Sequence, residues 1–154
     1  MYFARRREEL LNVLNSWIGV PYEHMGETKS GIDCSKLLAE VLQEIGVLTG
    51  KKEKVFLPFD WIFQTRKELL LEIVDENIKN FLRPGLKFEI LKKDPEFGDL
   101  VFFSLLKSGV TNHSGIYTGK NQIFHCLTKR SCMFYSLPEC WINRITFIYR
   151  LIEV

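Results

Sequence analysis

The sequence predicts an α+β domain in which helices come first and short antiparallel strands follow. Apolar residues recur at helical spacing through the first half of the chain, and short β-branched or aromatic runs separated by turn residues fill the second half. Helices and strands that are segregated along the chain are typical of this architecture. The length of 154 residues suits one domain, residues 1–154, with one core.

Three helices are predicted from runs of apolar residues at i, i+3, i+4 and i+7 spacing. They cover residues 10–18, 34–45 and 69–81. In the second helix Asp33 suits the N-cap and Gly46 suits the residue that ends the helix. Thr65 and Glu68 have the spacing of a capping box before the third helix. An aromatic, lysine-containing loop is expected over 50–64.

Four strands are predicted in the second half from β-branched and aromatic runs. They cover residues 100–103, 114–118, 122–127 and 145–152. The second and third of these strands flank a turn at Gly119-Lys120-Asn121, which predicts a hairpin. His113 lies at the start of this hairpin and His125 lies near its end.

Cys34 is a candidate nucleophile because it is predicted in the first turn of a helix. The N-terminus of a helix favours a thiolate, which predicts a lowered thiol pKa, and its free N–H groups can stabilise an oxyanion. The alternative is a core cysteine, since Cys34 also lies on the apolar stripe and cysteine is among the most buried residue types. From Cys34 alone, the core interpretation is favoured.

The two hairpin histidines favour the catalytic interpretation. If the hairpin loop has an odd number of residues, His113 and His125 share one face of the sheet, whereas an even loop separates them. On a shared face His113 takes the thiol proton and later protonates the leaving amine, while His125 hydrogen-bonds the other ring nitrogen and orients it.

Composition excludes several classes of protein. Net charge is +2, from 21 Lys and Arg against 19 Asp and Glu, so we expect no nucleic-acid partner. Neither a signal peptide nor a membrane span is recognised, so we expect a chain made in the cytoplasm. No zinc-type spacing or disulfide framework is recognised among the remaining cysteines, which have no assigned role: Cys126, Cys132 and Cys140.

Five segments together resemble the NlpC family of papain-like cell-wall cysteine peptidases. They are Trp17–Tyr22, Gly31–Ser35, Phe97–Phe103, His113–Gly119 and Ile123–His125. The resemblance covers most of residues 16–48 and 97–151, and it implies a papain-like fold in which a nucleophile at a helix N-terminus packs on an antiparallel sheet. Lys36 departs from the family pattern, which has glycine after the Asp-Cys-Ser run.

The resemblance also implies a site and a reaction. Cys34 would be the nucleophile, His113 the base and acid, and His125 its orienting partner. Tyr22 would help the backbone N–H of Cys34 to hold the oxyanion, with Asp33 and Ser35 supporting the helix start or the substrate. Members of the family cut amide bonds in peptidoglycan stem peptides, often between D-glutamate and a diamino acid, with no metal or organic cofactor.

The C-terminal segment Trp141–Arg150 and the helix expected over Trp61–Ile78 resemble phage-type members. This resemblance implies partners in a phage tail or related particle and action on the cell wall after delivery. Three alternatives remain open. They are an acyl or amide transferase using the same Cys-His-His site, a structural tail or secretion-particle component with an idle site and an apolar docking surface at 55–63, and a delivered toxin with the same chemistry.

Overall fold

The computed structural model describes residues 2–50, 68–106 and 109–154. The first part contains η1 (Phe3–Arg6), α1 (Arg7–Trp17), β1 (Glu27–Thr28), β2 (Gly31–Ile32) and α2 (Cys34–Glu44). The second contains α3 (Leu69–Phe81), β3 (Leu86–Leu91) and β4 (Leu100–Phe103). The third contains β5 (His113–Gly119), β6 (Gln122–Cys126), β7 (Cys132–Ser136), α4 (Glu139–Ile142) and β8 (Ile145–Glu153).

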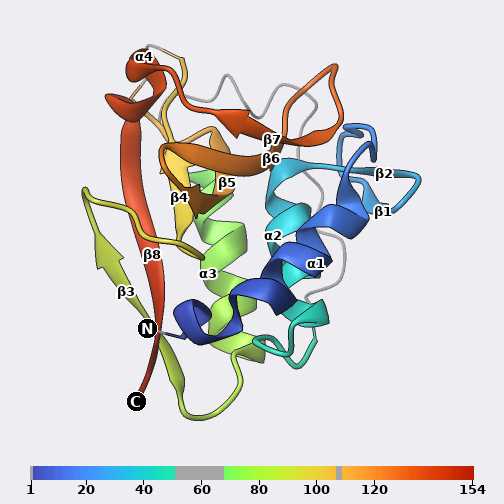
Figure 1. The fold of residues 1–154 in the computed structure, drawn as a ribbon. Helices are drawn as coiled ribbons and strands as arrows, with labels where there is room; N and C mark the ends of the chain where they lie inside the picture. Colours follow the sequence, from blue (N-terminus) through green and yellow to red (C-terminus); the bar gives the residue numbers. More distant parts are fainter. Residues whose placement is uncertain (1, 51–67, 107–108) are drawn as a thin grey trace.

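An antiparallel sheet with the strand order β3-β8-β4-β5-β6-β7 forms the centre of the described fold. Helix α2 packs on β5 and β6 and also contacts α1 and α3. The two chain ends lie at one end of the molecule, and α4 lies at the other (Figure 1). The α+β prediction, with the helix that begins at Cys34 packed on an antiparallel sheet, is confirmed.

Helix α2 begins and ends where local chemistry predicts. The Asp33 side chain accepts a hydrogen bond from the backbone N–H of Lys36 at 2.8 Å, which satisfies one of the free donors of the first turn. Gly46 follows the helix with a φ of +81°, a conformation that glycine adopts without strain. The N-cap prediction for Asp33 is therefore confirmed.

The central strands β4, β5 and β6 are buried on both faces, to which their side chains point alternately. In β4, Leu100 and Phe102 belong to the core under the helices, whereas Val101 and Phe103 belong to a second apolar cluster on the opposite face. Trp141 of α4 packs against this second cluster. We call the two sides the helix face and the α4 face.

Several elements differ from the sequence-based expectation. Strands β3 and β7 and helix α4 were not predicted, and β3 lies at one edge of the sheet with β7 at the other. Glu68 is the N-cap of α3 rather than its third helical residue, so the capping-box prediction is wrong. Its carboxylate instead accepts from the backbone N–H of Thr111 at 3.2 Å. Thr65, the 50–64 loop and the expected docking surface at 55–63 lie outside the described residues.

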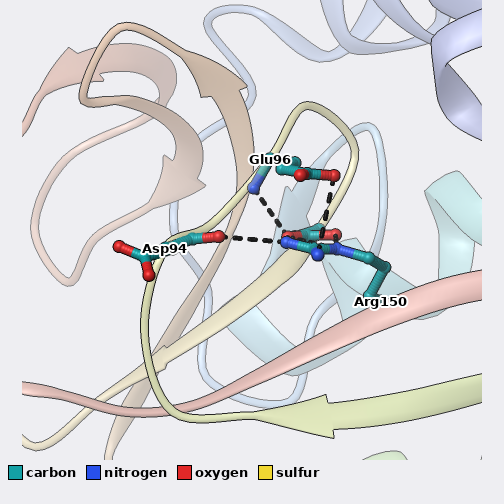
Figure 2. A network of polar contacts seen from close by, with 4 residues as sticks. Asp94, Glu96 and Arg150 are labelled. Atoms are coloured by element: carbon teal, nitrogen blue, oxygen red, sulfur yellow. Dashed lines mark hydrogen bonds and ion pairs between the residues drawn. The ribbon is translucent and has the colours of Figure 1, made fainter. Parts of the chain in front are cut away.

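A partly buried ion pair joins β8 to the turn before β4 (Figure 2). The guanidinium of Arg150 binds both carboxylate oxygens of Asp99, with the Nη2–Oδ2 pair at 2.8 Å, and also donates to the backbone oxygen of Asp94 at 3.0 Å. The Asp99 backbone oxygen accepts from the N–H of Tyr117 at 2.8 Å. A two-pronged pair of this kind fixes geometry as well as charge, so it holds the turn whose Asp99 backbone oxygen bonds to β5.

Candidate active site

A cavity of about 210 Å³ lies where α2 begins and the hairpin strands end. The residues that line it are Tyr22, Cys34, Leu105, Leu106, Asn112, His113, Leu127 and Thr128. The structure thus places the predicted nucleophile, base and tyrosine around one space. A larger hollow of about 460 Å³ lies along α3, beside Lys36.

A bulge in β5, rather than the length of the hairpin loop, places His113 and His125 on one face of the sheet. Its loop has only two residues, Lys120 and Asn121, both with positive φ, and this is an even number. A register shift between Tyr117 and Gly119 adds one extra residue to β5, which restores the odd count. The loop itself is even, but the extra residue in β5 places both histidines on one face, which is the arrangement expected of an odd loop.

Glycine at position 115 lets the two histidines approach each other. Continuing the register places Gly115 opposite His125, and a Cβ added at Gly115 would lie 3.3 Å from the Cβ of His125 and 3.0 Å from the backbone oxygen of Phe124. The imidazole of His113 reaches across this gap, and its Nε2 lies 2.8 Å from Nδ1 of His125.

The histidine pair is neutral at pH 7. Burial lowers the pKa of His113 well below its ordinary value, with the neighbouring His125 adding to the effect. Burial and the charge of Arg130 lower the pKa of His125 to about 4. If His113 carries its proton on Nε2 and donates to His125, its Nδ1 is left with a lone pair, which is the form a general base needs.

The Cys34 thiol is held in its protonated form. Burial and the nearby Asp33 carboxylate raise its pKa to about 12, although contacts from the hydroxyl and N–H of Ser114 favour the thiolate. The Ser114 hydroxyl also donates to the backbone oxygen of Cys34 at 3.1 Å, which ties β5 to the start of α2. The prediction of a lowered thiol pKa is wrong for this state, because desolvation outweighs the effect of the helix N-terminus.

Tyr22 reaches the cavity because its backbone is fixed on both sides. Its N–H donates to the backbone oxygen of Arg130 at 2.8 Å, and it forms a bridge with Ile32 just before α2. Its phenol hydrogen-bonds with Thr128, and burial raises the pKa of Tyr22. The phenol therefore stays protonated and able to donate a hydrogen bond.

Asp33 and Ser35 lie behind the nucleophile and do not line the cavity. The Ser35 hydroxyl donates to Oδ1 of Asp33 at 2.8 Å, the same oxygen that caps the helix. Lys36 is also buried, and its ammonium group lies 3.2 Å from the carboxylate of Glu27. The lysine that departs from the family pattern is thus directed to Glu27.

Aromatic side chains enclose the histidine pair on the α4 face, a feature the sequence-based analysis missed. The Trp141 ring lies edge-on to His113 and to His125, with centroids 5.6 Å away in each case. The Tyr135 ring stacks on His125 at 5.1 Å with an interplanar angle of 16°. Trp141 and Tyr135 come from α4 and β7, two elements that were not predicted, so no local signal linked them to the site.

The other three cysteines are not among the residues that line the cavity. Cys126 points to the helix face, as strand alternation predicts, and its Sγ lies 3.8 Å from the backbone oxygen of Val20. Cys132 is buried opposite Cys126 in the β6–β7 pair, whereas Cys140 is exposed, and all four cysteines are free.

Within the residues the structure describes, no group of three or more His, Cys, Asp or Glu side chains is placed to hold a metal ion. No helix of this part is long and apolar enough to cross a membrane.

Comparison with known proteins identifies the family. The NlpC/P60 family model matches residues 19–150, and the chain belongs to this family. It is 30% identical over 130 residues to the probable endopeptidase NlpC homolog of Haemophilus influenzae and 28% identical over 128 residues to the probable endopeptidase NlpC of Escherichia coli. These matches cover 84% and 83% of the chain but 54% and 66% of the two relatives.

Solved structures show the same fold. An NlpC/P60 family protein from Bacillus cereus superposes with a TM-score of 0.60 at 21% identity, covering 93% of this chain and 39% of that one. The NlpC/p60 domain of the peptidoglycan hydrolase SagA superposes with a TM-score of 0.53 at 18% identity, covering 92% of this chain and 95% of that one. The papain-like, NlpC-type fold class is thereby confirmed.

Proposed function

We propose that this chain is a cysteine peptidase that hydrolyses amide bonds in peptidoglycan stem peptides, with the D-glutamyl to diamino acid bond as its target. The observation that carries the proposal is the single cavity lined by Cys34, His113 and Tyr22, in which His113 is hydrogen-bonded to His125. Family membership supports it, as do relatives named as endopeptidases and one named murein DD-endopeptidase MepS/murein LD-carboxypeptidase, which is 24% identical over 148 residues.

The protonation states support attack assisted by a general base. Cys34 is protonated and His113 is neutral at pH 7, so the thiol proton moves to Nδ1 of His113 as the sulfur attacks the substrate carbonyl carbon. His125 accepts the hydrogen bond from Nε2 of His113 and stabilises the imidazolium that forms.

The carbonyl oxygen becomes an oxyanion as the carbon–sulfur bond forms. The protonated phenol of Tyr22 and the backbone N–H of Cys34 at the start of α2 are the donors that would hold it. When the carbon–nitrogen bond breaks, the imidazolium of His113 gives its proton to the leaving amine. Water then attacks the thioester with His113 again as base, which releases the acid and restores the thiol.

Digestion of purified sacculi and of a defined stem tripeptide, read by mass spectrometry, tests the proposal. New fragments from the wild type and none from Cys34→Ala are expected, and their masses identify the bond. Acyl transfer to an added amine with no hydrolysis product would instead favour the transferase alternative. Intact substrate with both proteins would contradict peptidase activity.

Alkylation tests the protonation state of the nucleophile. At pH 7 we expect iodoacetamide to label the exposed Cys140 before the buried, protonated Cys34, and labelling of Cys34 to speed up as pH rises toward 12. Peptide mapping by mass spectrometry measures both rates. Labelling of Cys34 ahead of Cys140 at neutral pH would indicate a thiolate formed before substrate binds.

A further inference from the structure

Asn112 is a buried residue directly before His113 whose side chain has one group without a partner. It is 3% exposed and lines the same cavity as Cys34 and His113. Its Oδ1 accepts a hydrogen bond from the backbone N–H of Leu105 at 2.9 Å. Its Nδ2 is buried and has no hydrogen-bond partner anywhere in the described part of the chain.

The orientation of this amide is determined by its surroundings. Turning the group over would bring NH₂ against the N–H of Leu105 and leave two donors facing each other, so Oδ1 must point to Leu105. A buried donor without an acceptor destabilises a folded chain, and such groups in native structures call for an explanation. A ligand whose oxygen accepts a hydrogen bond from Nδ2 in the cavity would explain the unpaired donor.

Beside the Tyr22 phenol, which would hold the oxyanion, Nδ2 of Asn112 is a second donor among the residues that line the cavity. Tyr22 and Thr128 hydrogen-bond with each other, and three leucines contribute apolar surface. No lysine or arginine is among the described residues that line the cavity, and His113 is neutral. The carboxylate of Asp33 lies close enough to raise the pKa of the Cys34 thiol and of Tyr22.

The lack of a lysine or arginine among the described lining residues and the nearby carboxylate of Asp33 determine which kind of ligand oxygen can accept from Nδ2. A carboxylate entering the cavity would lose water, meet no cation there and feel the negative charge of Asp33, which is unfavourable. An uncharged carbonyl oxygen accepts from a neutral amide without that cost. We propose that Nδ2 of Asn112 donates a hydrogen bond to a backbone carbonyl oxygen of the bound peptide, which makes Asn112 a substrate-binding residue that selects for a peptide carbonyl beside the scissile bond.

The proposal rests on a peptide being the substrate, and Asn112→Asp is the sharpest variant to test it. Aspartate keeps the oxygen that accepts from Leu105, removes the Nδ2 donor and adds a negative charge. Asn121→Asp is the matched control, since it makes the same charge change at the exposed turn on the far end of β5. Both changes are made in the Cys34→Ala background, so that the peptide binds without being cut.

Binding of the stem tripeptide is measured by calorimetry at pH 7, with thermal unfolding as a control for folding. Asn112→Asp is expected to raise Kd at least tenfold, while Asn121→Asp leaves it within twofold. A Kd within twofold for Asn112→Asp, or no binding of the peptide by Cys34→Ala itself, would overturn the proposal.

NMR of the bound protein tests the Asn112 contact independently of the Asn112→Asp variant, and cleavage by the wild type tests the peptidase proposal. In the Cys34→Ala protein the side-chain NH₂ resonances of Asn112 are expected to shift when peptide binds, and unchanged resonances in a bound sample contradict the proposal even if Asn112→Asp fails to fold. Cleavage by the wild type is scored separately. If binding depends on Asn112 but the wild type does not cleave the peptide, the peptidase proposal is rejected and the Asn112 contact is kept. If the wild type cleaves the peptide but binding does not depend on Asn112, the peptidase proposal is kept and the Asn112 contact is rejected.

Discussion

The two faces of the central strands β4, β5 and β6 are both buried, yet they carry different chemistry. On the helix face, Ser114 hydrogen-bonds the backbone of Cys34 and Phe124 packs in the main core. On the α4 face, His113 and His125 are hydrogen-bonded to each other under the ring of Trp141. Adjacent residues of one strand thus serve both sides, with Ser114 placing the helix that carries the nucleophile and His113 supplying the base.

The fold brings the nucleophile and the base together from opposite faces of one strand. Side chains alternate along a strand, so two consecutive residues point to opposite faces of the sheet. Groups from the two faces can reach one cavity only where the strand ends. The cavity lies at that end of β5, between the start of α2 and the hairpin. Variants on each face should therefore have effects of different kinds.

The largest expected effect is on the helix face. Cys34→Ala should abolish turnover of a stem peptide, because no other thiol lines the cavity. The lost sulfur leaves only a small gap in the core, so the protein should remain folded, with a free energy of unfolding lower by about 1 kcal/mol. Peptide cleavage and chemical denaturation measure the two quantities. An unfolded variant would favour the structural-cysteine interpretation.

The next effect separates the two histidines on the α4 face. His113→Ala should lower kcat about 10²- to 10⁴-fold, the usual range for loss of a general base. His125→Ala should lower kcat less, because it removes orientation and stabilisation of the imidazolium and leaves the base in place. Steady-state kinetics on one peptide compares them. Equal losses would mean that the two roles are assigned wrongly.

Trp141→Leu should lower kcat about tenfold, because the ring both positions the imidazoles and keeps water from them. Water would raise the pKa of His113 toward its ordinary value, so the acid limb of the pH–rate profile should move to higher pH. Phe134→Leu is the matched control. Its ring packs on Phe124 at 5.0 Å on the helix face, so it should lower stability without moving the profile. Identical profiles for Trp141→Leu and wild type would remove Trp141 from the site.

The last effect is on stability rather than turnover, and it depends on pH. In the unfolded chain His125 binds a proton below about pH 6.5, whereas in the folded chain it does so only below about 4. Between these values the unfolded state holds more protons, so the free energy of unfolding should fall as pH is lowered, by about 3 kcal/mol from this residue. Urea unfolding from pH 7.5 to 4 measures the slope, and His125→Asn should flatten it. A slope unchanged in the variant would mean that His125 titrates normally.

The fold was predictable where local pattern decides. The bounds of α3 and β4 match the predicted 69–81 and 100–103, because apolar periodicity reports which residues face a core. Strands β3 and β7 escaped prediction because they lie at the sheet edges, where half-exposed residues weaken the pattern. Assignment of phage-tail partners and of the stem-peptide bond stays a prediction that rests on the resemblance.

The sequence by itself determined the helix that begins at Cys34, its Asp33 cap and the strands that carry both histidines, since these depend on neighbours within a few residues. Tertiary structure alone decided the rest. The bulge in β5 set which face the histidines share, burial reversed the expected pKa of the thiol, and Trp141 reached the histidine rings from α4, an element joined to them only by the fold. Each of these depends on contacts or desolvation between residues distant in sequence, which no local pattern records.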